Sequence, residues 1–177
     1  MPKAPARNRD AEVAQRLLKH WHEAVPNDRM AHLVKDASRS FLRSLQLRLG
    51  RHDVSLGHWT FLRILWERDG ITQRELSNEA GVMEPTTAIA LQAMEKLGYI
   101  ERQRLAGNRK NSYIFLTPAG KRLKRVLVPL AEDVNTVALR GITQAEIAAT
   151  RRALLVMIDN LGSDSLASSQ GTDSAAR

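Results

Sequence analysis

The stretch that decides the fold reads ITQRELSNEAGVMEPTTAIALQAMEKLGYIERQRLAGNRKNSYIFLTPAG and spans residues 71–120. It opens with Thr72-Gln73-Arg74-Glu75, a capping box in which threonine and glutamate satisfy each other's free amides at a helix start. This short helix should end at Gly81. Pro85 suits the first turn of the next helix, and Gly98 suits its left-handed C-cap. These signals predict two helices joined by a tight turn.

A hairpin is predicted directly after the second helix. Two strand-like runs, Tyr99–Leu105 and Asn111–Leu116, are joined by a connection that contains Gly107 and Asn108. An apolar helix capped by Ser55 precedes the helix pair. The order helix, helix, turn, helix, hairpin over residues 55–117 is that of a winged helix-turn-helix.

Amphipathic helices are predicted on both sides of this central region, in residues 10–54 and 118–162. Their apolar faces are too extensive to be left in water, so they need a partner surface. Residues 1–9 read as a loose basic arm. Residues 163–177, rich in Ser, Ala, Gly and Asp, read as a disordered tail.

Composition excludes several classes of protein. The 177 residues contain no Cys, which rules out a disulfide scaffold, a thiolate metal site and a thiol redox switch. Apolar runs such as Ala153–Ile158 are far too short to span a membrane. The first residues show no secretion signal, so the expected location is the cytoplasm, without a membrane partner. The net charge of +8 favours an anionic partner.

The positive charge is concentrated in the predicted hairpin. Arg102, Arg104, Arg109 and Lys110 oppose only Glu101, and such a cationic loop suits phosphates or a minor groove. The alternative is an ordinary solvated hairpin. A second basic run, residues 121–125, follows and is either a phosphate-facing or a solvent face.

The predicted helix after Pro85 turns an almost uncharged side outward. Thr86 suits a phosphate at the helix start, Gln92 suits an adenine edge, and Ala88 and Ile89 suit thymine methyl groups. The alternative for Ile89 is packing on a neighbouring helix. The full set of candidate DNA-binding residues is Thr72, Gln73, Thr86, Ala88, Ile89, Gln92, Arg102, Arg104, Asn108, Arg109 and Lys110.

Residues 28–162 resemble, in element order, the multiple-antibiotic-resistance regulator (MarR) family. The resemblance rests on Ile71-Thr-Gln-Arg-Glu-Leu-Ser, on Met94-Glu-Lys-Leu-Gly-Tyr-Ile-Glu-Arg102, and above all on Leu116-Thr117-x-x-Gly120 after a basic wing. It implies a mainly α fold, a winged helix-turn-helix with a two-stranded β-wing, flanked by N- and C-terminal dimerisation helices. It also implies a homodimeric, cytoplasmic bacterial regulator on the nucleoid, usually a repressor released from DNA by a small ligand.

Two departures from the family pattern bear on DNA recognition. The family's wing usually reads Asp-x-Arg, whereas Asn108 and Lys110 stand here, so Arg109 is the expected minor-groove residue. The family also often has a basic residue where Ile89 stands. Operator preference should therefore differ from that of typical members.

A candidate effector site follows from residues that look out of place on apolar faces. Arg48 and His58 lie on apolar stripes, and His58-Trp59 matches the Gln-aromatic pair found in the family's effector pocket. The alternatives are a snorkelling arginine and a hydrogen-bonded core histidine. The candidate set is Ser44, Arg48, His58, Trp59 and Leu62, and it suits an aromatic carboxylate or an acyl-CoA ester.

No cofactor, metal site or enzyme activity is predicted. His20 and His22 point about 200° apart on a helix and cannot share an ion. No nucleotide-binding loop or catalytic-triad spacing is present. The leading hypothesis is a ligand-responsive repressor on a pseudo-palindromic site. The alternatives are a constitutive architectural DNA-binding protein and a winged-helix protein–protein module.

Overall fold

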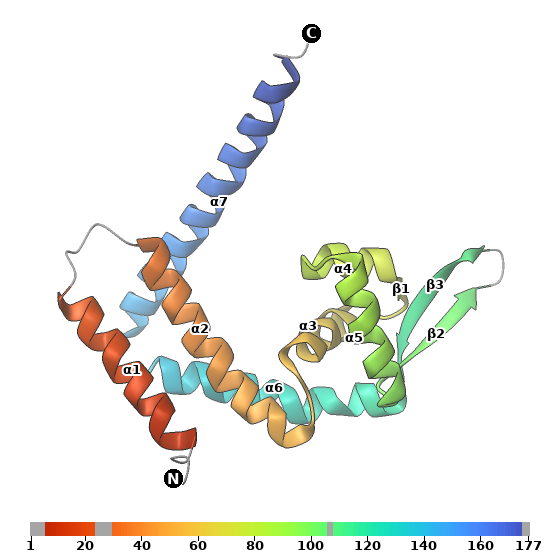
Figure 1. Ribbon diagram of the computed structural model, residues 1–177, viewed down its shortest axis with the longest axis horizontal. Helices are drawn as coiled ribbons and strands as arrows, with labels where there is room; N and C mark the ends of the chain where they lie inside the picture. Colours follow the sequence, from red (N-terminus) through yellow and green to blue (C-terminus); the bar gives the residue numbers. More distant parts are fainter. Residues whose placement is uncertain (1–5, 24–29, 106–107, 175–177) are drawn as a thin grey trace, which may run out of the picture. The chain divides into compact units, whose positions relative to one another are not determined.

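The computed structural model describes residues 6–23, 30–105 and 108–174 (Figure 1). The chain divides into two compact units, residues 1–135 and 136–177, which are considered separately. Its elements are α1 (Ala6–Glu23), α2 (Met30–Leu49), η1 (Gly50–His52), α3 (Leu56–Glu67), β1 (Ile71–Thr72), α4 (Gln73–Ala80), α5 (Glu84–Lys96), β2 (Ile100–Leu105), β3 (Asn108–Leu116), α6 (Pro118–Ala138) and α7 (Gln144–Ser174).

The predicted caps are confirmed around the helix-turn-helix. Ser55 Oγ accepts from the His58 N–H at the start of α3, and Thr72 and Glu75 form both bonds of the capping box of α4. Gly81 closes α4 with φ +63°, a left-handed conformation that suits glycine. The α4–α5 turn is therefore set by local chemistry.

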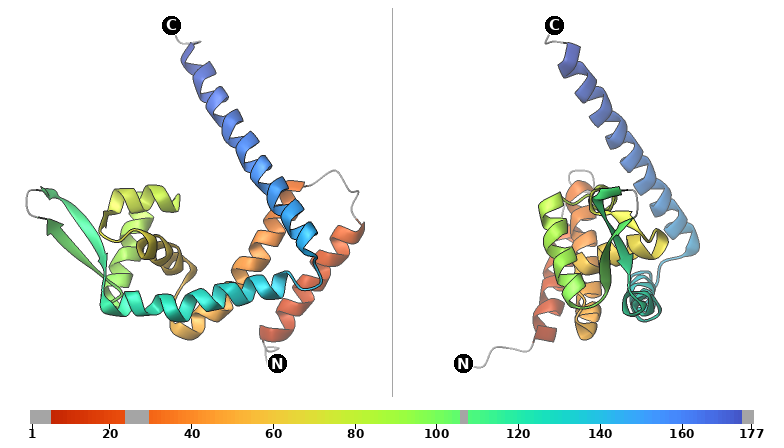
Figure 2. Two further views of the ribbon diagram at one scale, coloured as in Figure 1. Left: turned by 180° about the vertical axis from the view of Figure 1, so that it is seen from behind. Right: turned by 90° about the vertical axis from the view of Figure 1, so that its right-hand side faces the viewer.

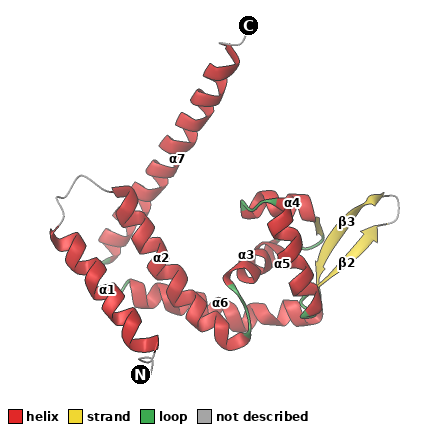
Figure 3. Cartoon of the chain, viewed as in Figure 1, coloured by secondary structure: helices red, strands yellow, loops and turns green. Residues whose placement is uncertain are grey.

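The sheet has one more strand than the sequence indicated. β2 and β3 form the predicted hairpin, which projects past α3, α4 and α5 (Figure 2). The two-residue β1 pairs antiparallel with β3, Ile71 opposite Ile114, and gives the order β1-β3-β2. The hairpin is thus anchored to the residues that start α4. Its two strands, β2 and β3, are the yellow arrows in Figure 3.

The core of the first unit is built around α3, as its nearly continuous apolarity predicted. Phe61, Leu62 and Leu65 are almost completely buried. They belong to a cluster with Leu91 and Met94 of α5 and with apolar residues of α2, α4, the sheet and α6. This cluster fixes one side of α5 and leaves its other side to solvent.

The joint between the hairpin and α6 is close-packed. A Cβ at Gly120 would lie 2.1 Å from the Tyr99 carbonyl oxygen, so no side chain fits there. Thr117 Oγ1 accepts from the Gly120 N–H and donates to the Gly98 carbonyl. The Trp66 indole N–H donates to the Gly120 carbonyl at 3.0 Å. The Leu116-Thr117-x-x-Gly120 sequence therefore joins the start of α6 to the turn between α5 and β2 and to α3.

Both predicted disordered ends need correction. Within residues 1–9, the segment from Ala6 is already helical as part of α1; residues 1–5 lie outside the described part. Within residues 163–177, α7 continues past Gly162 to Ser174, with 175–177 outside it. A helix propagates readily once nucleated, and no proline follows Gly162 to stop it. The predicted domain limits within residues 10–162, namely 10–54, 55–117 and 118–162, stay predictions.

No helix in residues 6–23, 30–105 or 108–174 has the length and apolarity needed to cross a membrane.

Candidate nucleic-acid interface

The outward face of α5 is an exposed stripe of Thr86, Ile89 and Gln92. Ile89 is 70% exposed, although it is a large apolar side chain. Ala88, which the sequence also placed on the outward side, and Ala93 flank the stripe and are half-buried. The alternative prediction was that Ile89 packs on a neighbouring helix. Within the first unit, no helix covers its side chain. Contact of Thr86, Ala88, Ile89 and Gln92 with DNA stays a prediction.

The opposite face of α5 is buried and bonded. Leu91 and Met94 are fully covered, and so is Thr87, whose hydroxyl lies 3.2 Å from Ser77 Oγ and 3.2 Å from the Met83 carbonyl oxygen. Ser77 also hydrogen-bonds the Val82 carbonyl. These contacts orient α5 on α4 and hold its stripe outward.

The N-terminus of α5 has no side-chain cap. Met83 occupies the N-cap position and is 78% exposed, and Pro85 lies in the first turn. Amides without a capping side chain at a helix start favour an anion. Thr86 is therefore placed where the sequence predicted a phosphate contact, while Glu84, beside it, lies 4.0 Å from the Arg74 guanidinium.

Two candidate DNA-binding residues at the start of α4, the N-cap Thr72 and Gln73, make contacts within the protein. The Thr72 hydroxyl and N–H donate to Glu75 Oε2 at 2.6 and 2.8 Å, and these bonds hold the pKa of Glu75 below its ordinary value. The Gln73 side-chain oxygen accepts from Arg102 at 3.4 Å. Both residues thus position α4 and the wing, whether or not they also reach DNA.

Arg102 is likewise engaged within the first unit. Its Nε lies 3.2 Å from Glu95 Oε2, and only 30% of the side chain is exposed. Arg104, on the same strand, is exposed. Asn108, Arg109 and Lys110 begin β3 at the tip of the wing, but their side chains lie outside the described residues. The predicted minor-groove role of Arg109 stays a prediction.

The basic run of α6 is partly neutralised. Lys121 lies 3.3 Å from Asp69, and Lys124 lies 3.3 Å from Glu67, whereas Arg122 and Arg125 are exposed. Two of the four basic residues therefore pair with the end of α3 and the loop that follows it, and two arginines remain at the surface.

The candidate effector residues are not gathered in one cavity. The Arg48 guanidinium donates to Asp133 Oδ2 at 2.8 Å and to Ser44 Oγ at 2.7 Å. The ion pair with Asp133 connects α2 to α6. The sequence predicted either an effector ligand or a snorkelling side chain for Arg48, and neither interpretation included this ion pair. Trp59 and Leu62 are buried in the core. His58 is half-buried; burial lowers its pKa below 6.5, and its Nδ1 makes no hydrogen bond to any described residue.

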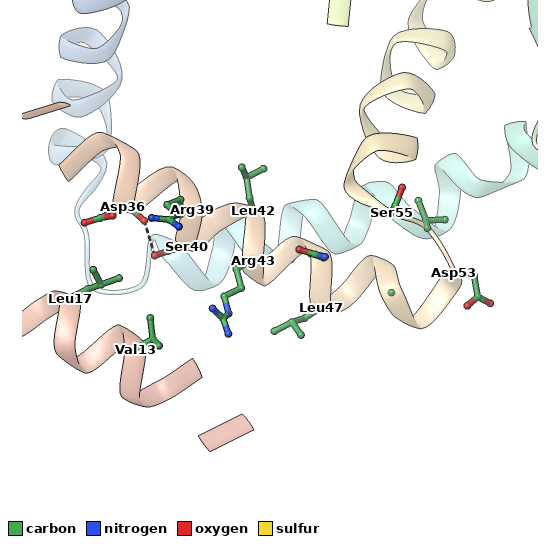
Figure 4. Close-up of a pocket in the computed structure, with 13 residues that line it drawn as sticks. Val13, Leu17, Asp36, Arg39, Ser40, Leu42, Arg43, Leu47, Asp53 and Ser55 are labelled. Carbon is green, nitrogen blue, oxygen red and sulfur yellow. Dashed lines mark hydrogen bonds between the residues drawn. The ribbon is translucent and has the colours of Figure 1, made fainter. Parts of the chain in front are cut away.

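One pocket of about 970 Å³ lies between α1 and α2 (Figure 4). Arg43 and Leu47 point from α2 toward α1, and Val13 points back toward α2. Asp36, also at its edge, accepts a hydrogen bond from the Trp21 indole at 3.2 Å. None of the five candidate effector residues lines this pocket.

A second pocket, of about 810 Å³, opens between α2, α3 and α6. Phe41, Trp59 and Trp66 give it aromatic walls, and the two tryptophans meet edge to face at 5.7 Å. Its charged lining residues are Arg63, Glu67, Glu79, Lys124 and Glu132. Three of these residues already have ion-pair partners: Lys124 pairs with Glu67, and Glu79 pairs with Arg68, which lies outside the pocket lining.

Sequence reasoning selected only Trp59 among the residues that line this second pocket. It missed Arg63, an exposed cation on a helix whose neighbours Phe61, Leu62, Ile64 and Leu65 are buried or half-buried. A single charged residue inside such an apolar run was the signal that could have identified it.

Within residues 6–23, 30–105 and 108–174, no group of three His, Asp or Glu side chains is arranged to hold a metal ion.

Known proteins support one class for this fold and interface: a winged helix-turn-helix regulator. The model of the MarR family matches residues 54–112, from the residue before the Ser55 cap to the wing. This chain belongs to the MarR family. The proteins it resembles are transcriptional regulators and not enzymes.

Individual relatives extend the similarity beyond the winged helix. The transcriptional regulator TtmR of Methylorubrum extorquens is 30% identical over 130 residues, which are 73% of this chain and 62% of that protein. The chain thus spans less than two thirds of that relative's length. The crystal structure of transcriptional regulator PA3341 is 32% identical, with a TM-score of 0.66, over 75% of this chain and 98% of that one.

A further similar structure contains DNA. It is that of a putative MarR family regulator from Listeria monocytogenes complexed with a 26mer DNA. That chain is 25% identical, with a TM-score of 0.67, over 77% of this chain and 91% of its own.

Proposed function

We propose that this chain is a homodimeric transcriptional repressor that binds a pseudo-palindromic operator on the bacterial chromosome. A small aromatic acid or its acyl-CoA ester would release it. The observation that carries the DNA-binding part is the exposed stripe of α5, held outward by a buried opposite face and flanked by a basic wing. In this arrangement a recognition helix enters the major groove and a wing reaches the adjacent backbone or minor groove.

Exposed apolar side chains support the homodimer. On α2, the large residues Met30, Leu33, Val34, Phe41, Leu42 and Leu47 are each 38–55% exposed. On α7, within the second unit, Leu155, Val156, Ile158 and Leu161 are each 53–67% exposed. Long helices with this much apolar surface need a partner. A second copy supplies matching faces by symmetry.

The DNA-binding proposal is tested by selecting sites from a random duplex library with the full chain, followed by footprinting. We expect a pseudo-palindrome whose half-sites lie about one helical turn apart, because a two-fold dimer presents two α5 helices. Protection of a single unrepeated half-site, or no enriched sequence, contradicts the proposal. Sedimentation of the free chain gives the independent test of the dimer.

The second pocket is the proposed effector site. Its volume of about 810 Å³ suits a small-molecule ligand, and Phe41 and Trp59 offer faces for an aromatic ring. Within the described residues no ion pair is formed by Arg63, which makes it the candidate partner of a carboxylate. This assignment replaces Arg48, whose guanidinium is occupied by Asp133, as the principal cation.

The effector proposal is tested by titrating phenolic acids and their CoA esters into the protein–operator complex. Trp fluorescence reports occupancy beside Trp59, and anisotropy of labelled DNA reports release. Release that follows the fluorescence change supports the proposal. A complex that no compound of either class dissociates contradicts it.

A further inference from the structure

We propose that α5 reads its half-site through the C5 methyl groups of thymine, with Ile89 as the residue that determines this specificity. The inference rests on the proposed DNA binding and adds the chemical feature of the DNA that is recognised. The exposed stripe of α5 carries it.

The stripe presents an apolar surface where a recognition helix meets bases. Ile89 is 70% exposed in the middle of the stripe, between Thr86 and Gln92, and the methyl groups of Ala88 and Ala93 flank it. A large apolar side chain left in water at such a position gains by covering another apolar group. In the major groove, the thymine methyl is the apolar group that a base pair offers.

The charges of α5 lie at its two ends. Glu84 is near Arg74 at 4.0 Å, and Glu95 is bound by Arg102 at 3.2 Å; Lys96 occupies the last position. From Pro85 to Met94 the helix, all of which the structure describes, has no charged residue. Arg or Lys would be needed at the centre for the common contact to guanine, and Glu or Asp for cytosine. Gln92 provides the one long polar side chain there, and its amide suits adenine.

The stripe is also held rigidly enough to discriminate by contact. The hydroxyl of Thr87, two residues before Ile89, is bonded to Ser77 and to the Met83 carbonyl, and Leu91 is fully buried two residues after it. Ile89 is itself β-branched and restricted at χ1. The backbone that carries Ile89 is therefore held in place, and the few χ1 rotamers open to its side chain limit how far it can adapt to the base opposite.

The test uses the full chain and its selected duplex, with thymines replaced one at a time by uracil. Uracil keeps the pairing and removes only the methyl group. Loss of one contacted methyl should weaken binding about fourfold, the factor that corresponds to burial of one methyl-sized group. Replacing the symmetry-related thymine as well should weaken binding about 16-fold in total. Uracil in the flanks should have no effect.

The variant Ile89→Ala provides the specific control. It should bind the thymine duplex more weakly than the parent chain, and it should no longer distinguish thymine from uracil at the sensitive position. Leu97→Ala removes an apolar side chain, 46% exposed, from the far end of the same helix and should keep the full uracil effect.

The outcomes separate this inference from the proposed function. A selected site that tolerates uracil at every thymine overturns the inference alone, and so does a uracil effect that persists in Ile89→Ala. Failure to select any sequence overturns the inference and the proposed function together.

Discussion

Arg102 on β2 lies 3.2 Å from Glu95 on α5, and this ion pair connects the wing to the proposed recognition helix. A second contact from Arg102 reaches Gln73 at the start of α4. One arginine therefore holds the three elements that would contact DNA in a fixed relation.

The Arg102–Glu95 pair should be measurable as a coupling between two side chains. We expect Arg102→Ala, Glu95→Gln and the double variant, unfolded in urea, to give a coupling of about 0.5 to 1 kcal/mol, since the pair is partly exposed. Glu95→Gln should also strengthen DNA binding, because it removes a carboxylate and leaves Arg102 available for a phosphate. Additive effects on the free energy of unfolding would mean that the pair does not hold the wing.

Gly120 should not tolerate any side chain. Gly120→Ala places a Cβ against the Tyr99 carbonyl oxygen and should lower the free energy of unfolding by about 3 kcal/mol. The matched control is Gly57→Ala in α3, where the nearest atom outside the local backbone is 3.8 Å away. That variant should gain up to about 1 kcal/mol from helix propensity. Equal stability of the two variants would contradict the close-packed joint.

His58 should make the fold less stable in mild acid. Burial lowers its pKa in the folded state below 6.5, so the unfolded chain binds the proton more readily as the pH falls through that value. Stability is fully present above 6.5 and declines below it. When the pH is lowered from 7.5 to 5.5, the Tm of the parent chain should therefore fall by more than the Tm of His58→Gln.

The control for His58 is His52→Gln, at an exposed position. Its Tm should follow that of the parent chain across the same range. A parallel pH profile for His58→Gln and the parent chain would show that the unpartnered Nδ1 has no effect on stability.

Arg63 should determine the response to an aromatic acid. Arg63→Ala should raise the concentration of phenolic acid needed for DNA release by about tenfold or more, because one charge-assisted hydrogen bond is lost. Arg48→Ala should unlink α2 from Asp133 but leave the acid's affinity little changed. The reverse result would place the ligand at Arg48, where the sequence first suggested it.

Local chemistry explains which parts of the fold could be predicted. Each cap at Ser55, Thr72 and Thr117 is formed within three residues of sequence, and each is present in the structure. The buried face of α5 likewise followed from helical spacing. Such features depend on neighbours in the chain, so a single sequence contains the information for them.

Contacts between distant residues explain what was missed. β1 has two residues, and only its pairing with β3, more than 40 residues later, makes it a strand. The pairs Arg48–Asp133 and Arg102–Glu95 depend on how helices and strands are placed in space. The sequence therefore predicts roles for Arg48 and Arg102 in ligand and DNA binding, which stay predictions, but does not reveal the ion pairs that both make within the protein.

The most direct test of DNA binding through α5 and the wing is the salt dependence of affinity for the selected duplex and for a scrambled one. Anisotropy of labelled DNA from 50 to about 200 mM salt should give a steep log–log slope, corresponding to about 6 to 10 phosphate contacts per dimer. The selected duplex should bind more tightly at every salt concentration, and Ile89→Ala should narrow that gap while keeping the slope. A flat, weak response that does not distinguish the two duplexes would contradict the account.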